Sequence, residues 1–190
     1  MGEFRGIEIM HVESKDLYLR PLKTEDAEGN YPHWLNDKEV CKYNSHSDIL
    51  YTKEMALEYI KKVNFGDTDK VFAIICKESE RHIGNISLQH ICKKNNNAEF
   101  AILIGEKSYY KKGYAKQAGK ILLSYGFEEL KLHRIYCGTS KFNIPMIKLA
   151  QFLGMKKEGQ RTEAFWKNGE YVDIIEFGIL KKNFVEVGYE

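Results

Sequence analysis

The strongest constraint on the fold is a strand pattern followed closely by a helix pattern, between residues 98 and 130. The run AEFAILIG (98–105) is almost continuously apolar, as in a strand inside a sheet. Apolar side chains then recur at three-to-four-residue spacing from residue 113 to residue 130, with Leu122 and Tyr125 at the centre of the apolar face. Burying this strand and this helix face together predicts a domain that mixes helices and strands.

Three more helices are expected. Thr24 is a candidate cap for a short one, and Thr52 for the helix TKEMALEYIKKV. The third contains Pro145 in its first turn, where proline is tolerated, and stops at Gly154. The aromatic and polar segment 31–48 is expected to be irregular.

Alternating or continuous apolar runs predict the remaining strands, and Asn168-Gly169 predicts a tight hairpin between the last two. We therefore expect one mixed α/β domain over residues 1–190, with about seven strands, mostly antiparallel, and about four helices. Residues 1–15 are an N-terminal extension or the start of the first strand. The remaining strands are expected at residues 16–22, 70–77, 82–91, 132–140, 156–166 and 170–180.

Composition excludes several classes of function. The chain has 29 basic and 27 acidic residues, a net charge of +2, so it lacks the basic excess that a nucleic-acid-binding protein needs. No apolar run approaches the roughly 20 residues of a membrane span, and no signal-peptide core is present, which predicts a cytoplasmic protein. The four cysteines lack zinc-site spacing, so we expect buried, reduced thiols and no metal.

The start of the helix at residue 113 is a candidate anion site. The first backbone N–H groups of a helix have no intrahelical partner, and the helix dipole favours negative charge there. Gly113 leaves room for a ligand, and Lys111, Lys112 and Lys116 add positive charge. A pyrophosphate suits this site, although a solvated basic turn that caps a core helix is an alternative. The sequence GEKS at 105–108 does not match a Walker loop, because Glu106 separates the glycine from the lysine.

Three stretches together resemble the GNAT acetyltransferase superfamily, and within it the RimJ/RimL-like branch. YKKGYA (110–115) matches the family's acetyl-CoA loop except at Tyr110, and NIPMIKLAQFLGM (143–155) resembles its later Asn-helix-Gly segment. LYLRPLKTEDAEGNYPHWLND and the final hairpin resemble the branch. The resemblance covers residues 16–182. It implies that the fourth and fifth strands, 98–104 and 132–139, splay apart to hold acetyl-CoA.

The resemblance also implies roles for individual residues. A base must take a proton from the amine, and Glu99 is the candidate; His90 and Gln89 are alternatives, and Glu99 as a solvated strand-end residue is another. Asn143 is expected to contact the cofactor. Backbone groups of Phe100, Ile102 and Ile104 are expected to pair with pantetheine, and those of Lys111, Lys112, Gly113, Tyr114, Ala115 and Lys116 with the pyrophosphate.

The family's usual general acid is missing. Ala150 and Met146 occupy the positions where relatives place Tyr or Ser. Tyr109, Tyr110 and solvent are alternatives for this role. Because the usual acid is missing, a non-catalytic CoA-binding module is a further alternative. Covalent catalysis through Cys137 is disfavoured, since no His is placed to activate it.

The acceptor is expected to be a primary amine of a small molecule, such as an amino sugar or a sugar nucleotide. A protein N-terminus is the alternative, and the chain is not acidic enough to demand a polyamine. For Trp34 and Tyr43, the alternative to acceptor binding is packing of the helices onto the sheet. Further candidates for the acceptor site, on the last hairpin, are Glu163, Trp166 and Asp173. A monomer or a homodimer is expected. Candidate acceptor-binding residues are Trp34, Asn36, Tyr43, His46 and Gln89.

Overall fold

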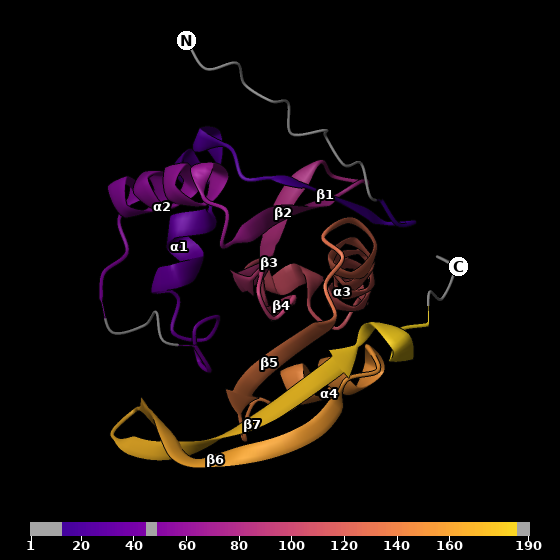
Figure 1. Cartoon of the computed structure of the whole chain (residues 1–190). Coiled ribbons are helices and arrows are strands. Elements are labelled where there is room, and N and C mark those ends of the chain that lie inside the picture. Colours follow the sequence, from indigo (N-terminus) through magenta and orange to yellow (C-terminus); the bar gives the residue numbers. More distant parts are fainter. Residues whose placement is uncertain (1–12, 45–48, 186–190) are drawn as a thin grey trace.

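The computed structural model describes residues 13–44 and 49–185. They form one seven-stranded sheet in the order β1-β2-β3-β4-β5-β7-β6, flanked by four α-helices (Figure 1). Neighbouring strands are antiparallel except β4 and β5, which are parallel. The mixed α/β fold and the single sheet are confirmed. The strands are β1 (Leu17–Pro21), β2 (Lys70–Cys76), β3 (Arg81–Cys92), β4 (Asn97–Ile104), β5 (Arg134–Ser140), β6 (Lys156–Lys167) and β7 (Glu170–Leu180).

The helices follow the predicted order, with corrections at the N-terminal end. Thr52 caps α2 (Lys53–Phe65) as expected, since its side chain accepts a hydrogen bond from the Met55 N–H. The segment expected to be irregular contains a helix, α1 (Tyr31–Asn36), with Pro32 in its first turn. The short helix before it is a 3₁₀ turn (Thr24–Glu28) whose cap is Lys23 and not Thr24, because the Asp26 carboxylate accepts the Lys23 N–H.

The later helices are α3 (Tyr114–Ser124) and α4 (Ile144–Phe152). The pattern that predicted one helix to residue 130 continues after α3 as a π turn at Tyr125–Glu129. Gly154, the expected stop of α4, follows with φ +80°. None of the helices in the described part of the chain is long and apolar enough to cross a membrane.

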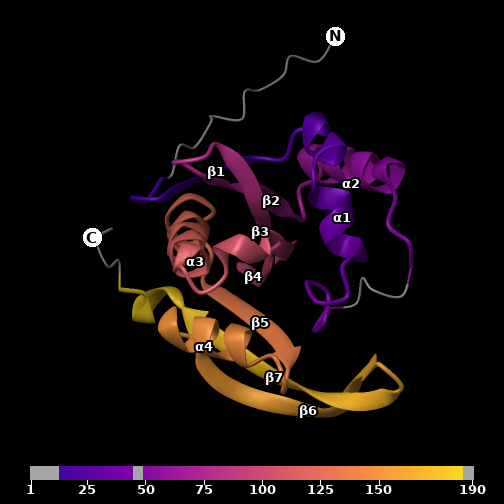
Figure 2. The ribbon, with the colours of Figure 1, turned by 180° about the vertical axis from the view of Figure 1, so that it is seen from behind.

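The two faces of the sheet are covered differently (Figures 1 and 2). One face carries the larger apolar core, in which residues of α3 and α4 such as Leu122 and Leu149 pack against strand residues such as Ile86 and Phe100. The other face carries a smaller core of α1 and α2 residues, including Trp34 and Ile60, packed mainly on β2. The second core therefore leaves much of β4 and β5 uncovered on that face.

The parallel strands β4 and β5 separate soon after they meet. They pair only at Asn97↔Arg134, Ala98↔Ile135 and Glu99↔Tyr136. The remaining residues of β4, Phe100 to Ile104, pair only with β3 among the strands. This confirms the splayed strand pair that the family resemblance implied.

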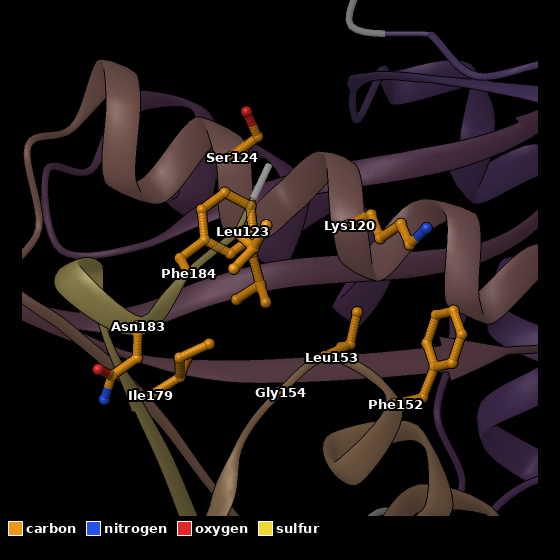
Figure 3. A pocket seen from close by; sticks show the side chains of 10 residues that line it. Lys120, Leu123, Ser124, Phe152, Leu153, Gly154, Ile179, Asn183 and Phe184 are labelled. Carbon is orange, nitrogen blue, oxygen red and sulfur yellow. The ribbon is translucent and has the colours of Figure 1, made fainter. Parts of the chain in front are cut away.

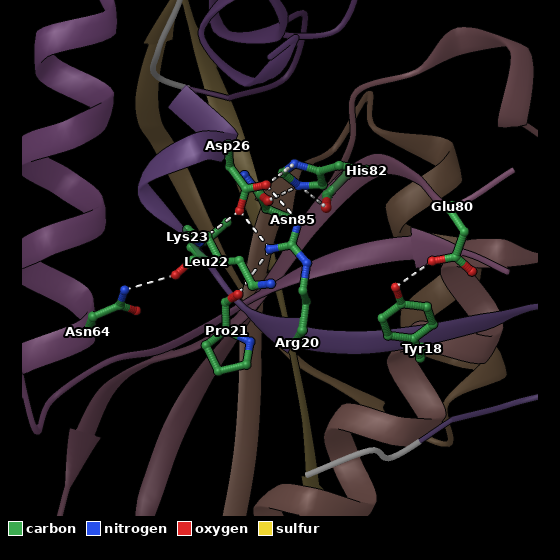
Figure 4. Close-up of polar contacts among 11 residues, drawn as sticks. Tyr18, Arg20, Pro21, Leu22, Lys23, Asp26, Asn64, Glu80, His82 and Asn85 are labelled. Atoms are coloured by element: carbon green, nitrogen blue, oxygen red, sulfur yellow. Dashed lines mark hydrogen bonds and ion pairs between the residues drawn. The ribbon is translucent and has the colours of Figure 1, made fainter. Parts of the chain in front are cut away.

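A polar cluster holds β1, the 3₁₀ turn and β3 together beneath α1 (Figure 4). Both carboxylate oxygens of Asp26 accept hydrogen bonds from the Arg20 guanidinium at 2.7 Å. The Nδ1 atom of His82 lies 3.4 Å from Asp26 Oδ1. Burial raises the pKa of Asp26, but the hydrogen bonds from Arg20, His82 and Lys23 outweigh it, so the pKa lies well below its usual range.

The last hairpin turns at Asn168 and Gly169, as predicted. Their φ angles are +53° and +86°, which is the left-handed conformation that a type I′ turn requires. The four cysteines are free thiols: Cys41, Cys76 and Cys137 are buried and Cys92 is half-buried.

Candidate active site

The backbone edge of β4 forms one wall of the split between β4 and β5. The Gly105 N–H donates to the Ile83 carbonyl at 2.9 Å, and the Leu103 carbonyl lies against Gly84. Backbone groups alternate in direction along an antiparallel strand, so Leu103 and Ala101 turn theirs to β3. The residues expected to pair with pantetheine, Phe100, Ile102 and Ile104, therefore turn their backbone groups to the β5 side. Phe100 lies where the split begins, and the other two lie beyond the last β5 pair.

Three polar side chains form a row across the sheet at the closed end of the split. Gln89 of β3 pairs with Glu99 of β4, which in turn pairs with Tyr136 of β5. Residues that are directly opposite each other share a face of the sheet, and here it is the face that carries α1 and α2, because Leu103 on the same face packs against that core. The Glu99 side chain is 33% exposed. A carboxylate here can receive a proton from a group that approaches from this face.

His90 also belongs to this row, because of a bulge in β3. The register between β3 and β4 shifts after Gln89, and His90 has φ +51°. Its Nδ1 atom lies 2.9 Å from Glu99 Oε2. The structure thus brings together Glu99, His90 and Gln89, the three residues considered for the base.

Tyr136 is a site residue that the sequence did not single out. Burial and the nearby Glu99 carboxylate both raise the pKa of its hydroxyl, so it stays protonated. It is the only tyrosine among the described residues that pairs directly with Glu99. Tyr136 is identified by its position opposite Glu99 in the register of β4 and β5, which the sequence alone does not give.

The start of α3 has the geometry expected for an anion site. Gly113 is the N-cap with φ +88°, and a Cβ atom added there meets no atom within 4 Å. Lys111 also has a positive φ, +60°. One expected donor is already engaged, since the Lys116 N–H donates to the Gly113 carbonyl at 3.0 Å. The N–H groups of Tyr114 and Ala115 precede it in the first turn, where helical N–H groups have no intrahelical partner.

Asn143, the other expected cofactor contact, caps α4. Its side-chain oxygen accepts the Met146 N–H at 3.3 Å, and its amide donates to Thr139 Oγ1 at 3.0 Å. This ties the start of α4 to the end of β5. A contact between Asn143 and the cofactor stays a prediction.

Two of the expected acceptor-binding residues have structural partners. Trp34 is only 5% exposed, its indole N–H donates to Glu106 at 3.1 Å, and its ring occupies the space over Gly105. The Asn36 amide donates to the carbonyls of Pro32 and Tyr51 and accepts the Tyr51 N–H. Both side chains hold α1 in place, so a direct role in acceptor binding stays a prediction.

A hollow of about 400 Å³ lies where the segment after α1, the end of β5 and the tip of the β6–β7 hairpin meet. Tyr43 lines it, with the Lys42 ammonium 5.2 Å from the centre of its ring. His46, the fourth expected acceptor contact, lies outside the described residues. The residues lining the hollow are Lys42, Tyr43, Ser140, Phe142, Phe165, Lys167, Asn168, Glu170 and Val172.

The other candidates near the last hairpin have mostly structural contacts. Asp173 accepts hydrogen bonds from Lys141, Gln160 and the Glu163 N–H, so it shapes the hairpin. Trp166 is exposed and packs edge-on against Tyr171.

The usual positions of the general acid contain no proton donor. Ala150 is fully buried, and Met146 packs against the main core. Of the two tyrosines considered in their place, Tyr109 shares a hydrogen bond with Ser79. Burial raises the pKa of Tyr110. Tyr136 is thus the tyrosine that pairs with the candidate base.

Cys137 is a poor nucleophile. Burial, followed by the Glu99 charge, raises the pKa of its thiol to about 12. In the ranges that the structure describes, no group of three or more His, Cys, Asp or Glu residues is arranged to hold a metal ion.

A known family matches most of this chain. The model of the acetyltransferase (GNAT) domain matches residues 16–156. The chain belongs to this family. GNAT proteins transfer the acetyl group of acetyl-CoA to an amine, so the chain is an acetyl-CoA-dependent N-acetyltransferase, and the resemblance found in the sequence is confirmed.

Relatives and solved structures agree with this assignment. An uncharacterized N-acetyltransferase of Bacillus licheniformis is 31% identical over 171 residues, covering 88% of this chain and 94% of the relative. The spermidine N(1)-acetyltransferase of Escherichia coli K12 is 30% identical over 168 residues, covering 88% and 87%. The crystal structure of the spermidine N-acetyltransferase of Vibrio cholerae with CoA and spermine superposes with a TM-score of 0.80 at 25% identity, covering 88% and 97%.

Proposed function

We propose that this N-acetyltransferase acts on a primary amine that reaches Glu99 from the face of the sheet that carries α1 and α2. The row of Gln89, Glu99 and Tyr136 at the closed end of the split carries the proposal. Acetyl-CoA supplies the thioester. The N–H groups at the start of α3 hold its pyrophosphate, and the unpaired edge of β4 holds the pantetheine and keeps water out of the split.

Glu99 is the proposed general base. An ammonium group cannot attack a thioester, and a positioned carboxylate that takes its proton contributes about 10²–10⁴-fold to the rate. His90, at 2.9 Å, orients the carboxylate. Tyr136 keeps its proton and is placed to donate it, or a hydrogen bond, toward the sulfur as the C–S bond breaks. This assigns the missing acid to β5 in place of Met146 and Ala150.

A polyamine-type amine is the first acceptor class to test. Residues 24–44 and 49–65, which border this face, contain seven Asp or Glu residues against five Lys. Two of the relatives named above are spermidine acetyltransferases. A cationic acceptor is favoured beside such an acidic segment, because opposite charges attract over several ångströms.

Amino sugars, including phosphorylated ones, are the second acceptor class. The 400 Å³ hollow has two lysines, Lys42 and Lys167, and one acid, Glu170, among its lining residues. This balance suits an acceptor with an anionic group. A cytoplasmic location, a monomeric or homodimeric state and the boundaries of the domain stay predictions.

Release of the CoA thiol, measured over a panel of amines at saturating acetyl-CoA, tests the proposal. The panel contains spermidine, an amino sugar, its phosphate and a peptide with a free N-terminus. Turnover that is fastest with spermidine supports the first class, and turnover fastest with the sugar phosphate supports the second. Preference for the peptide would contradict both small-molecule classes. Tight CoA binding without thiol release from any amine would overturn the enzymatic proposal in favour of a binding module.

A further inference from the structure

The two helices on the α3–α4 side of the sheet contain no acidic residues. No Asp or Glu occurs in residues 107–127 or in residues 141–157. These stretches contain α3 and α4, in a chain whose total charge is only +2. Such separation of charge creates a local positive potential that attracts anions. Lys107 of these stretches pairs with Asp37 and Glu39, and Lys141 pairs with Asp173. The other lysines are Lys111, Lys112, Lys116, Lys120, Lys148, Lys156 and Lys157.

Two of these lysines converge on one aromatic ring. The ammonium of Lys116 lies 4.4 Å from the centre of the Phe152 ring, and that of Lys120 lies 5.4 Å from it. Phe152 belongs to α4 and is 44% exposed. Figure 3 shows Lys120 of α3 and Phe152 of α4 at the same end of a hollow between the two helices.

This arrangement leaves positive charge unbalanced. Lys116 and Lys120 are four residues apart on α3, a spacing at which like charges repel. Among the described residues, neither forms an ion pair with a carboxylate. Contacts with the ring face stabilise each ammonium in part. An anion bound between the two would balance the remaining charge.

The pair lies along α3 from the pyrophosphate site. Lys116 is in the first turn after Gly113, and a rise of 1.5 Å per residue places Lys120 about 10 Å from Gly113 along the axis. CoA carries a third phosphate, on the 3′-hydroxyl of its ribose, a few bonds beyond the pyrophosphate. The pyrophosphate already has the loop N–H groups with Lys111 and Lys112.

We propose that Lys116 and Lys120, held in place by Phe152, bind the 3′-phosphate of CoA and make the enzyme select CoA over 3′-dephospho-CoA. The inference rests on the proposed binding of the pyrophosphate at the start of α3. It adds a specificity site for the donor, outside the residues that handle the acetyl group. Phe152 acts as a positioning residue, because it touches the lysines and not the phosphate.

Calorimetric titration with CoA and with 3′-dephospho-CoA at low salt tests this inference. The wild-type protein should bind CoA at least tenfold more tightly. Lys120→Gln should reduce that ratio to about threefold, and the variant with both Lys116→Gln and Lys120→Gln should bring it close to one. Phe152→Leu should lower the ratio by a smaller factor than the double variant. Adding salt should weaken the binding of CoA more than that of 3′-dephospho-CoA.

The matched control is the double variant Lys61→Gln and Lys62→Gln. It removes the same charge from exposed positions on α2, and it should keep the wild-type ratio. Equal binding of both nucleotides by the wild type, or an unchanged ratio in the Lys116 and Lys120 variant, would overturn the inference and leave the proposed function intact. Binding of neither nucleotide by folded wild type would overturn the pyrophosphate site itself.

Discussion

The two faces of the sheet differ in charge as well as in packing. The face that carries α3 and α4 has the larger apolar core, and its surface helices contain lysines without acids. The face that carries α1 and α2 has a smaller core, a buried carboxylate at Asp26 and the partly exposed Glu99. One reactant is a polyanion and the other an amine. In the proposed function each reactant approaches the side that carries the opposite charge, and the two meet at the split between β4 and β5.

The largest expected effect concerns the structure of the acidic face. Asp26→Ala leaves the Arg20 guanidinium without its bidentate partner beneath α1, and breaking a buried ion pair costs about 3 kcal/mol or more. Urea unfolding at neutral pH measures the loss. Glu28→Ala is the control, because Glu28 lies in the same 3₁₀ turn but its ion pair with Lys53 is exposed, so its cost should stay below about 1 kcal/mol. Equal losses of unfolding free energy in the two variants would show that the Asp26–Arg20 pair stabilises the fold no more than an exposed ion pair does.

Low pH should selectively weaken the interaction between Asp26 and Arg20. The pKa of Asp26 is lowered in the folded protein, so its contribution to the free energy of unfolding is complete above the unfolded value, near 4, and is lost as pH falls below it. Urea unfolding between pH 6 and pH 3 should therefore show a steeper decline for the wild type than for Asp26→Asn. Parallel curves would contradict the lowered pKa.

Replacing the proposed base should abolish most of the chemistry without affecting the basic face. Glu99→Gln removes the proton acceptor and should lower kcat about 100-fold or more, while the Kd for CoA changes less than twofold. His90→Gln removes only the group that orients Glu99 and should lower kcat about three- to tenfold. Steady-state thiol release and calorimetry measure the two quantities. A Glu99→Gln enzyme with more than half of the wild-type kcat would eliminate Glu99 as the base.

A smaller effect is expected where the basic face contacts the cofactor. Gly113→Ala puts a methyl group into the open space above the start of α3 and strains a residue at φ +88°. CoA affinity should fall about tenfold. Gly169→Ala is a close control, with φ +86° and equally open surroundings at the far hairpin. It should lose similar stability and keep its affinity for CoA. Equal affinities of the two variants for CoA would contradict the proposal that the start of α3 binds the pyrophosphate.

The smallest effect should come from the Tyr136 hydroxyl, which lies in the same row as Glu99. Tyr136→Phe keeps the ring in β5 and removes the proposed proton donor. Because a thiolate is already a fair leaving group, kcat should fall only about three- to tenfold, with KM for acetyl-CoA unchanged. Comparing leaving groups of different acidity sharpens the test, since a loss that shrinks with more acidic thiols indicates proton donation. An unchanged kcat would contradict proton donation by Tyr136 and would favour solvent as the proton donor.

The sequence predicted the parts of the fold that repeat a local pattern. The strands, α2, α3 and the Asn168-Gly169 turn were readable from periodicity and turn chemistry. The helix α1 was missed, because six residues are too few to show helical periodicity and Tyr31, Pro32 and Trp34 read as an aromatic loop. The cap at Lys23 was missed because it depends on the backward reach of the Asp26 carboxylate.

The candidate site divides in the same way. Gly113 and the lysines beside it were predicted from the local sequence, and Glu99 was predicted from the family resemblance. Tyr136 became visible only when the register placed it beside Glu99. Asn36 was predicted to bind the acceptor, but its amide has partners 4 and 15 residues away in the chain. Side chains whose partners depend on tertiary contacts are not assigned by local patterns.

The short ladder between β4 and β5 has a mechanical consequence. Among the described residues, three residue pairs form the strand ladder between β1–β4 and the β5-β7-β6 half of the sheet. A pantetheine arm that pairs with the free edge of β4 extends this ladder as an eighth strand would. We therefore expect the bound donor to stabilise the junction between the two halves of the sheet, and at 100 times its Kd it should add about 2.7 kcal/mol to the free energy of unfolding. Release of CoA at the end of each turnover should then return the junction to its three residue pairs.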